Sequence, residues 1–259
     1  MGRLSGLFDV KKERVLNVYC TAGFPTLDDT LPVLEALQAS GADIVELGMP
    51  YSDPLADGPV IQHSSSIALV NGMTIEKLFL QLEGFRNRVH IPVILMGYMN
   101  PVLQYGFEKF CADAARVGID GLILPDLPPY EFEKTYQPIL HRQGLDFIFL
   151  VTPETAAERI AKLDALSSGF LYAVSSSATT GSEGAVPVEN YLQRLQAMPL
   201  KNPVLVGFGI KDESTFDTVC RYAAGGIIGT AYIKALENNR DIHAATSQFL
   251  SSILGGKVS

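Results

Sequence analysis

The chain has few basic residues and no long uncharged apolar run. Lys and Arg number 20 against 28 Asp and Glu, which leaves a net charge of -8. Nucleic acids and anionic membranes are bound by clustered basic side chains, so neither is expected as the main partner. No uncharged apolar run approaches the ~20 residues of a membrane span, and the N-terminal segment lacks the apolar stretch of a signal peptide. We therefore expect a cytoplasmic protein that binds a small molecule.

Cysteine and histidine are also scarce. Cys20, Cys111 and Cys220 lie far apart without the spacing of metal ligands, as expected of reduced thiols. Of the four histidines, only His63 closely follows a predicted strand, and we interpret it as an ordinary loop or helix residue. We expect no disulfide framework, no metal site and no histidine general base. No predicted strand ends in a lysine, which argues against a Schiff-base aldolase.

Apolar residues occur as short runs that alternate with helical periods. Both faces of each run are apolar, which is typical of strands in a parallel sheet covered by helices. Eight such runs begin near residues 15, 42, 93, 121, 147, 170, 204 and 225. Between them, 3.6-residue periods predict helices at 27–40, 74–89, 106–117, 130–142, 155–166, 188–198, 213–222 and 241–254.

This alternation predicts an α/β fold, a single (β/α)8 TIM barrel with extra short helices. The strand starts are regularly spaced, and 259 residues suit one barrel domain over residues 1–259. An open doubly wound sheet is the second possibility. No linker or low-complexity tract marks a second domain.

Three carboxylates lie in the run ELGMPYSDPLADGP at residues 46–59. Glu46 ends an apolar strand, where side chains of an α/β fold face the ligand crevice. Burial there should raise the pKa of Glu46, whereas Asp57, on a polar loop, should stay ionised. Two carboxylates tuned in this way suit cleavage or isomerisation of a phosphorylated metabolite by proton transfer. Asp53 and Asp57 could equally be turn formers.

Glycine-rich segments indicate where a phosphate would bind. GFGIKD at 207–212 follows the seventh predicted strand, and GGIIGTA at 225–231 includes the eighth. A helix that starts after Gly229 and Thr230 would point unpaired N–H groups at an anion. The loop at 175–184 could add donors through Thr180 and Gly181. Each glycine by itself is also compatible with a simple tight turn.

On these residues the chain resembles the α subunit of tryptophan synthase. The run at 46–59 looks like that family's signature, and further matches are TAGFP from 21, YMNP from 98, PDLP around 126, TTG around 180, GFGI from 207 and GTA from 229. The resemblance extends from Leu7 to about Leu254. It implies a barrel enzyme that cleaves indole-3-glycerol phosphate to indole and glyceraldehyde 3-phosphate by a retro-aldol reaction, with no cofactor and no metal.

The resemblance also implies residue roles. Glu46 would shuttle protons, Asp57 would accept the indole N–H, and Tyr172 would lie beside Glu46. Tyr19 and Met96 would sandwich indole, although both could be ordinary inward barrel residues. The remaining implied substrate contacts, mostly to phosphate, are Thr180, Gly181, Gly207, Phe208, Gly209, Gly229 and Thr230. Ser176 and Ala178 stand where some relatives have Arg and Gly.

A β subunit is the implied partner. In the family, an αββα complex passes indole to a pyridoxal-phosphate β subunit, and the α chain itself binds no such cofactor. Residues 50–54 and 126–129 would face that partner, with exposed Met49, Tyr51 and Leu127 as contacts; alternatively these are loop residues folded against the barrel rim. Two other functions stay open. One is a different phosphate-binding barrel enzyme, such as an isomerase of tryptophan or histidine synthesis. The other is a non-enzymatic regulatory subunit, which would not need Glu46 and Asp57.

Overall fold

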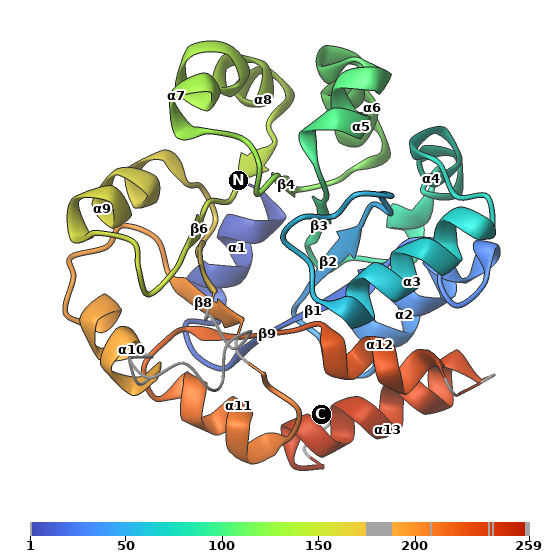
Figure 1. Cartoon of the computed structure of the whole chain (residues 1–259). Helices are drawn as coiled ribbons and strands as arrows, with labels where there is room; N and C mark the ends of the chain where they lie inside the picture. Colours follow the sequence, from blue (N-terminus) through green and yellow to red (C-terminus); the bar gives the residue numbers. More distant parts are fainter. Residues whose placement is uncertain (1, 175–187, 208, 238, 240, 257–259) are drawn as a thin grey trace.

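The strands form one parallel sheet that curls into a ring (Figure 1). The computed structural model describes residues 2–174, 188–207, 209–237, 239 and 241–256. Within them, nine strand segments pair in the order β5-β4-β3-β2-β1-β9-β8-β7-β6. Their bounds are β1 (Val15–Thr21), β2 (Ile44–Gly48), β3 (Val93–Met96), β4 (Gly121–Ile123), β5 (Asp146–Phe147), β6 (Leu150–Val151), β7 (Leu171–Val174), β8 (Val204–Gly207) and β9 (Gly225–Ile228).

The two edge segments, β5 and β6, are halves of one predicted strand. Only Ile148 and Phe149 separate them. The Ile148 N–H donates to the Leu122 carbonyl on β4 at 3.1 Å, and the Phe149 carbonyl accepts from the Tyr172 N–H on β7 at 3.0 Å. The segment thus bonds to both neighbours and closes the sheet. The predicted (β/α)8 barrel is confirmed, and the open sheet is wrong.

With the exception of the first helix, the helices surround the ring (Figure 1). In the described residues the helices are α1 (Arg3–Val10), α2 (Thr30–Ala39), α3 (Pro59–Val70), α4 (Ile75–Gln81), α5 (Met99–Tyr105), α6 (Phe107–Val117), α7 (Pro129–Glu131), α8 (Gln137–Gln143), α9 (Ala157–Leu166), α10 (Val188–Gln196), α11 (Glu213–Cys220), α12 (Thr230–Glu237) and α13 (Ile242–Leu254). Every predicted helix is present. The helical periods did not predict α1, α3, α5 and α12, although a helix starting after Gly229 and Thr230 was expected from the glycine segment. None of these helices has the length and apolar character needed to cross a membrane. The expectation of a single domain over residues 1–259 stays a prediction.

Apolar side chains fill the amino-terminal end of the barrel. This inner cluster consists of Leu4, Val15, Ile44, Ile94, Ile123, Ile148, Phe170, Leu205 and Ile227. Leu4 belongs to α1, which lies across the inside of the ring in Figure 1. Gly169 makes room for it, since a Cβ there would lie 2.2 Å from a Leu4 methyl. With this end filled, a ligand must enter from the carboxyl ends of the strands, as in other barrels of this kind.

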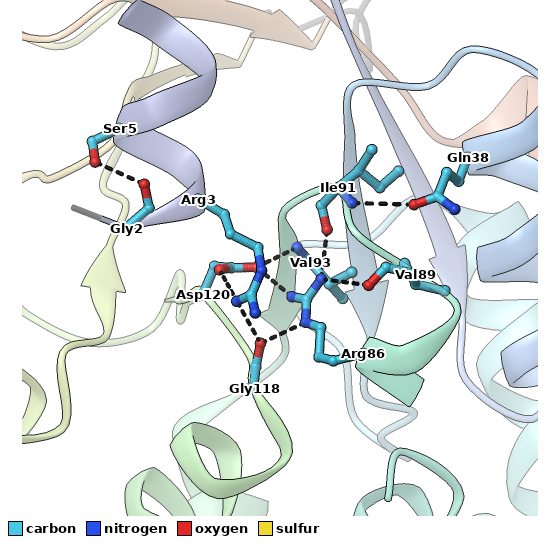
Figure 2. A network of polar contacts seen from close by, with 10 residues as sticks. All are labelled: Gly2, Arg3, Ser5, Gln38, Arg86, Val89, Ile91, Val93, Gly118 and Asp120. Carbon is cyan, nitrogen blue, oxygen red and sulfur yellow. Dashed lines mark hydrogen bonds and ion pairs between the residues drawn. The ribbon is translucent and has the colours of Figure 1, made fainter. Parts of the chain in front are cut away.

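A polar network ties the amino-terminal ends of neighbouring elements together (Figure 2). Asp120, just before β4, is buried and accepts hydrogen bonds from the Val93 N–H at 2.8 Å and from Arg3 at 3.0 Å. Arg86 also donates to Asp120, and to the Gly118 carbonyl at 2.9 Å. Burial lowers the pKa of Arg86 to about 10, against the opposing effect of Asp120. The network joins α1, β3 and β4 and lies at the end opposite the expected site.

Candidate active site

Glu46 lies inside the barrel on β2. Its Cα pairs with that of Tyr19 on β1 and with that of Ile94 on β3. The side chain is fully buried, and its Oε1 accepts a hydrogen bond of 2.6 Å from the Asn17 amide. The other oxygen, Oε2, is buried without a hydrogen-bond partner among the described residues. The carboxyl group therefore keeps one oxygen that forms no hydrogen bond with the described residues.

Burial controls the ionisation of this carboxyl group. It raises the pKa of Glu46 from 4.5 to about 8, although the Asn17 hydrogen bond favours the charged form. The sequence predicted this direction from the apolar neighbours in the strand. With a pKa near neutrality, the group is populated in both forms and can donate and accept a proton in one reaction cycle.

Asp57 lies in the loop between β2 and α3 and is half-buried. Its Oδ2 accepts a hydrogen bond from the Tyr98 hydroxyl at 3.1 Å, and that hydroxyl accepts from the Ala56 N–H at 3.0 Å. Burial raises the pKa of Asp57, and the Tyr98 bond opposes this effect. The loop is thus less solvated than the sequence suggested. Asp53, by contrast, is exposed and accepts a hydrogen bond from the adjacent Ser52, as a turn residue would.

Two glycines make room for the tyrosine rings of the site. A Cβ on Gly207 of β8 would lie 2.7 Å from the Tyr172 ring, and one on Gly48 of β2 would lie 2.1 Å from the Tyr19 hydroxyl. Both tyrosines therefore pack directly against neighbouring backbone inside the barrel. Any larger residue at either glycine would displace a ring.

Electrostatics show that these side chains share one neighbourhood. Burial raises the pKa of Tyr172 well above 10, and the carboxylates of Glu46 and Asp57 raise it further. Burial and then Asp57 likewise raise the pKa of Tyr19. The structure thus brings the two carboxyl groups and the two tyrosines together at the carboxyl-end half of the barrel. Their catalytic roles stay predictions.

Met96 ends β3, on the side of β2 opposite β1. It is half-buried, and its Cα pairs with that of Gly48. Tyr19 and Met96 therefore come from the two strands that flank Glu46. This placement is compatible with either an indole site or ordinary barrel packing.

The two glycine segments expected to bind phosphate lie side by side. β8 ends at Gly207, and this residue pairs with Ile227 of the adjacent β9. Gly209 is exposed with φ at +40°, and Thr230 is the exposed first residue of α12. Gly229 is not required by packing, because a Cβ there would make ordinary contacts of 3.5 Å. The other predicted contacts Thr180, Gly181 and Phe208, and the departures Ser176 and Ala178, lie outside the described residues.

The expected exposure of two interface residues is wrong. Met49 is 7% exposed and Leu127 is 4% exposed, because both loops fold back onto the barrel rim. The Met49 side chain packs beside Gly97, where a Cβ would lie 2.6 Å from it. Tyr51 is half-buried, with its ring centroid 5.5 Å from that of Tyr98. These residues follow the alternative interpretation of loop residues packed on the rim.

His63 lies on the surface of α3, with its Nε2 3.3 Å from the Glu237 carboxylate on α12. It is an ordinary helix residue, as predicted. In the described ranges, no three His, Cys, Asp or Glu side chains gather as metal ligands would. The expected independence from metals and cofactors stays a prediction.

The sequence did not single out two residues of this site. Asn17 and Tyr98 each contact one of the two carboxyl groups. Asn17 could have been noticed as a polar residue two positions before Tyr19, and therefore on the same strand face. Tyr98 lies in the YMNP motif that carried part of the resemblance.

Residues 8–254 match the family model of the tryptophan synthase alpha chain. The chain belongs to this family. The tryptophan synthase alpha chain of Parabacteroides distasonis is 47% identical over 98% of this chain and 99% of its own length. The tryptophan synthase alpha chain of Christiangramia forsetii is 51% identical over 87% of this chain and 89% of its own length. The crystal structure of tryptophan synthase subunit alpha from Legionella pneumophila is similar with a TM-score of 0.86 at 36% identity, covering 98% of this chain and 97% of that one.

Family membership shows that the chain is an enzyme of the tryptophan synthase alpha group. It sets aside the two alternatives left open by the sequence, an isomerase barrel and a regulatory subunit. The residues matched by the family model include Glu46 and every other predicted site residue.

Proposed function

We propose that this chain is a carbon–carbon lyase that cleaves indole-3-glycerol phosphate to indole and glyceraldehyde 3-phosphate in tryptophan biosynthesis. The observation that carries the proposal is Glu46, a fully buried carboxyl group with a pKa of about 8 inside a barrel of the tryptophan synthase alpha family. A group of this kind can give and take protons near neutral pH. The reaction requires both transfers.

In the proposed reaction, protonated Glu46 first protonates the ring carbon that bears the glycerol side chain. The positive charge that develops on the ring is stabilised by Asp57, which accepts the hydrogen bond of the ring N–H. The Glu46 carboxylate then takes the proton of the hydroxyl next to the ring. The carbon–carbon bond breaks, its electrons return to the ring, and an aldehyde is released. One proton enters and one leaves, so Glu46 is restored.

Tyr98 supports the role of Asp57. Its hydroxyl donates to Asp57 Oδ2 and accepts from the Ala56 N–H, which leaves Oδ1 for the substrate. Half-buried Tyr172 and buried Tyr19 contribute ring surface beside the carboxyl groups, and Met96 contributes from β3. We propose that these three side chains hold the indole ring.

The phosphate end of the substrate is proposed to bind where β8 and β9 end. Gly207 and Gly209 lie on one segment and Gly229 on the other, and Thr230 begins α12. Backbone N–H groups at a helix start favour an anion, and the Thr230 hydroxyl can add a donor. Thr180, Gly181 and Phe208 complete the proposed set of substrate contacts.

We further propose a cytoplasmic complex with a tryptophan synthase β subunit, to which indole is passed. The loops after β2 and β4 are the proposed contact face. Leu55, on the first loop, is 94% exposed, and Tyr130, after the second, is also exposed. Exposed apolar side chains of this kind are typical of protein contacts.

The direct test is release of indole from indole-3-glycerol phosphate by the purified chain, with and without a β subunit. We expect slow release that the β subunit accelerates. Glu46→Gln should abolish turnover while substrate binding is retained, because shape is kept and proton exchange is lost. Glu158→Gln, an exposed carboxyl on α9, is the matched control and should turn over like the wild type. Wild-type turnover by Glu46→Gln would contradict the mechanism.

A further inference from the structure

Asn17 is a buried polar residue that contacts the proposed acid–base group. It lies on β1, fully buried, and its Nδ2 donates to Glu46 Oε1 at 2.6 Å. Its Cα pairs with that of Ile44, one inward position closer to the amino end than the pair of Tyr19 and Glu46. Asn17 therefore lies between the apolar inner cluster and the site.

An asparagine in this place is unfavourable for folding. Strands favour β-branched and aromatic residues, and the neighbouring inward positions of the inner cluster are apolar. The Asn17 Oδ1 is buried and has no hydrogen-bond partner in the part of the chain that the structure describes. A buried polar atom without a partner lowers stability, so packing alone does not explain this residue.

We propose that Asn17 is a positioning residue that determines which oxygen of Glu46 exchanges protons with the substrate. The inference rests on the proposed lyase function. The Asn17 N–H occupies a lone pair of Oε1 and makes that oxygen the weaker base. The mobile proton is then carried by Oε2, the oxygen without a partner among the described residues. The same bond restrains rotation of the carboxyl group, which keeps Oε2 in a fixed place.

The other titratable groups near Glu46 do not replace this bond. Cys20 and Tyr19 come from β1, Tyr172 comes from β7 and Asp57 comes from the loop after β2. Burial raises the pKa of all four, so the thiol and both phenols are neutral near pH 8. The remaining charge, on Asp57, disfavours a second carboxylate nearby. The Asn17 amide is therefore the identified contact that favours ionised Glu46.

The test is Asn17→Leu, which keeps the approximate shape and removes the donor. A hydrogen bond to a charged group corresponds to a pKa change of about one to two units. Because the proposed reaction starts from protonated Glu46, the basic limb of the kcat profile should move up by about that amount. On the plateau below this limb, kcat should fall by roughly three- to tenfold, because a higher pKa makes Glu46 a weaker acid. KM should change less than about threefold, because Asn17 contacts Glu46 and not the substrate.

Asn202→Leu is the matched control. Asn202 lies just before β8, outside the barrel interior. Its side-chain amide donates hydrogen bonds to the carbonyls of Asp164 and Ser167. Its replacement should lower stability and leave the pH profile of the folded enzyme unchanged. A profile that moves equally in both variants would overturn the proposal, because a general loss of packing would explain it.

A second measurement does not depend on turnover. The carboxyl stretching band that disappears in Glu46→Gln reports the ionisation of Glu46 by infrared titration, and its midpoint should rise in Asn17→Leu. If that variant does not fold, Asn17→Ser removes the same amide with a smaller change in shape. An unchanged midpoint in a folded variant would overturn the proposal. If the wild type does not cleave indole-3-glycerol phosphate, the proposed function fails, while this titration still tests the Asn17 contact.

Discussion

Replacement of Glu46 by Gln should increase the stability of the protein relative to the wild type progressively as the pH rises. The folded pKa of about 8 lies above the 4.5 of an unperturbed glutamate. Between these values the folded chain holds a proton that the unfolded chain releases. The stabilising effect of the neutral form is complete below pH 4.5 and is lost as the pH rises through 8. Glutamine does not ionise and shows no such loss.

The magnitude follows from the pKa difference. Each pH unit within the window changes the free energy of unfolding by about 1.4 kcal/mol. Between about pH 5 and pH 8 the difference between variant and wild type should therefore grow by roughly 4 kcal/mol, a large part of the ~5–15 kcal/mol that stabilises a typical protein. The glutamine NH2 replaces unpaired Oε2 and has a desolvation cost of about 1–3 kcal/mol. That cost is independent of pH, so it shifts the curve without changing its slope.

The assay is urea unfolding of both proteins at a series of pH values from acidic to mildly alkaline. The difference in free energy is plotted against pH, with Glu158→Gln as a control that should give a flat line. A flat line for Glu46→Gln would refute the reasoning. It would mean that Glu46 ionises as readily in the barrel as in the unfolded chain, and the proposed acid–base role would lose its physical basis.

Three further predictions concern the loops and the opposite end of the barrel. Asp57→Asn should lower kcat about 10²- to 10³-fold, because it removes the charge proposed to face the indole N–H, and Tyr98→Phe should lower kcat less. Equal losses of kcat in steady-state kinetics would contradict this order. Gly229→Ala should unfold like the wild type, since its Cβ meets only ordinary contacts of 3.5 Å, but KM should rise; an unchanged KM would place the phosphate elsewhere. Asp120→Ala leaves Arg86 without its buried partner, so the free energy of unfolding measured in urea should fall by about 3–5 kcal/mol while kcat is retained. Wild-type stability of this variant would argue against this account of the network.

Much of the fold could be predicted from the sequence because its strands are apolar on both faces and regularly spaced. The predicted first strand coincides with β1, Val15–Thr21. The break between β5 and β6 was not predictable, since the run FIFLVT is uniformly apolar and carries no signal for a change of bonding partner. α3 was also missed, because three consecutive serines weaken its apolar period after Pro59.

The site was predictable where chain position determines it. The position of Glu46 near the carboxyl end of a predicted strand, followed by the motif, was enough to predict that it lies at the site. Asn17 was not found because its importance depends on the register between β1 and β2, which a single strand does not reveal. The exposure of Met49 and Leu127 was misjudged for a similar reason, since only the folded rim shows that both loops turn inward.

The burial that suits Glu46 to proton transfer also makes it a source of instability, and the barrel separates these two effects in space. Its amino-terminal end is filled by the inner cluster and by Leu4 of α1, which keeps water from the carboxyl group. On the same end, Asp120 joins α1, β3 and β4 through fully formed hydrogen bonds. At the site, by contrast, Glu46 Oε2 and Asn17 Oδ1 are buried without a hydrogen-bond partner among the described residues. A barrel built in this way can keep an unsatisfied carboxyl oxygen for its substrate because the other end is satisfied and closely packed.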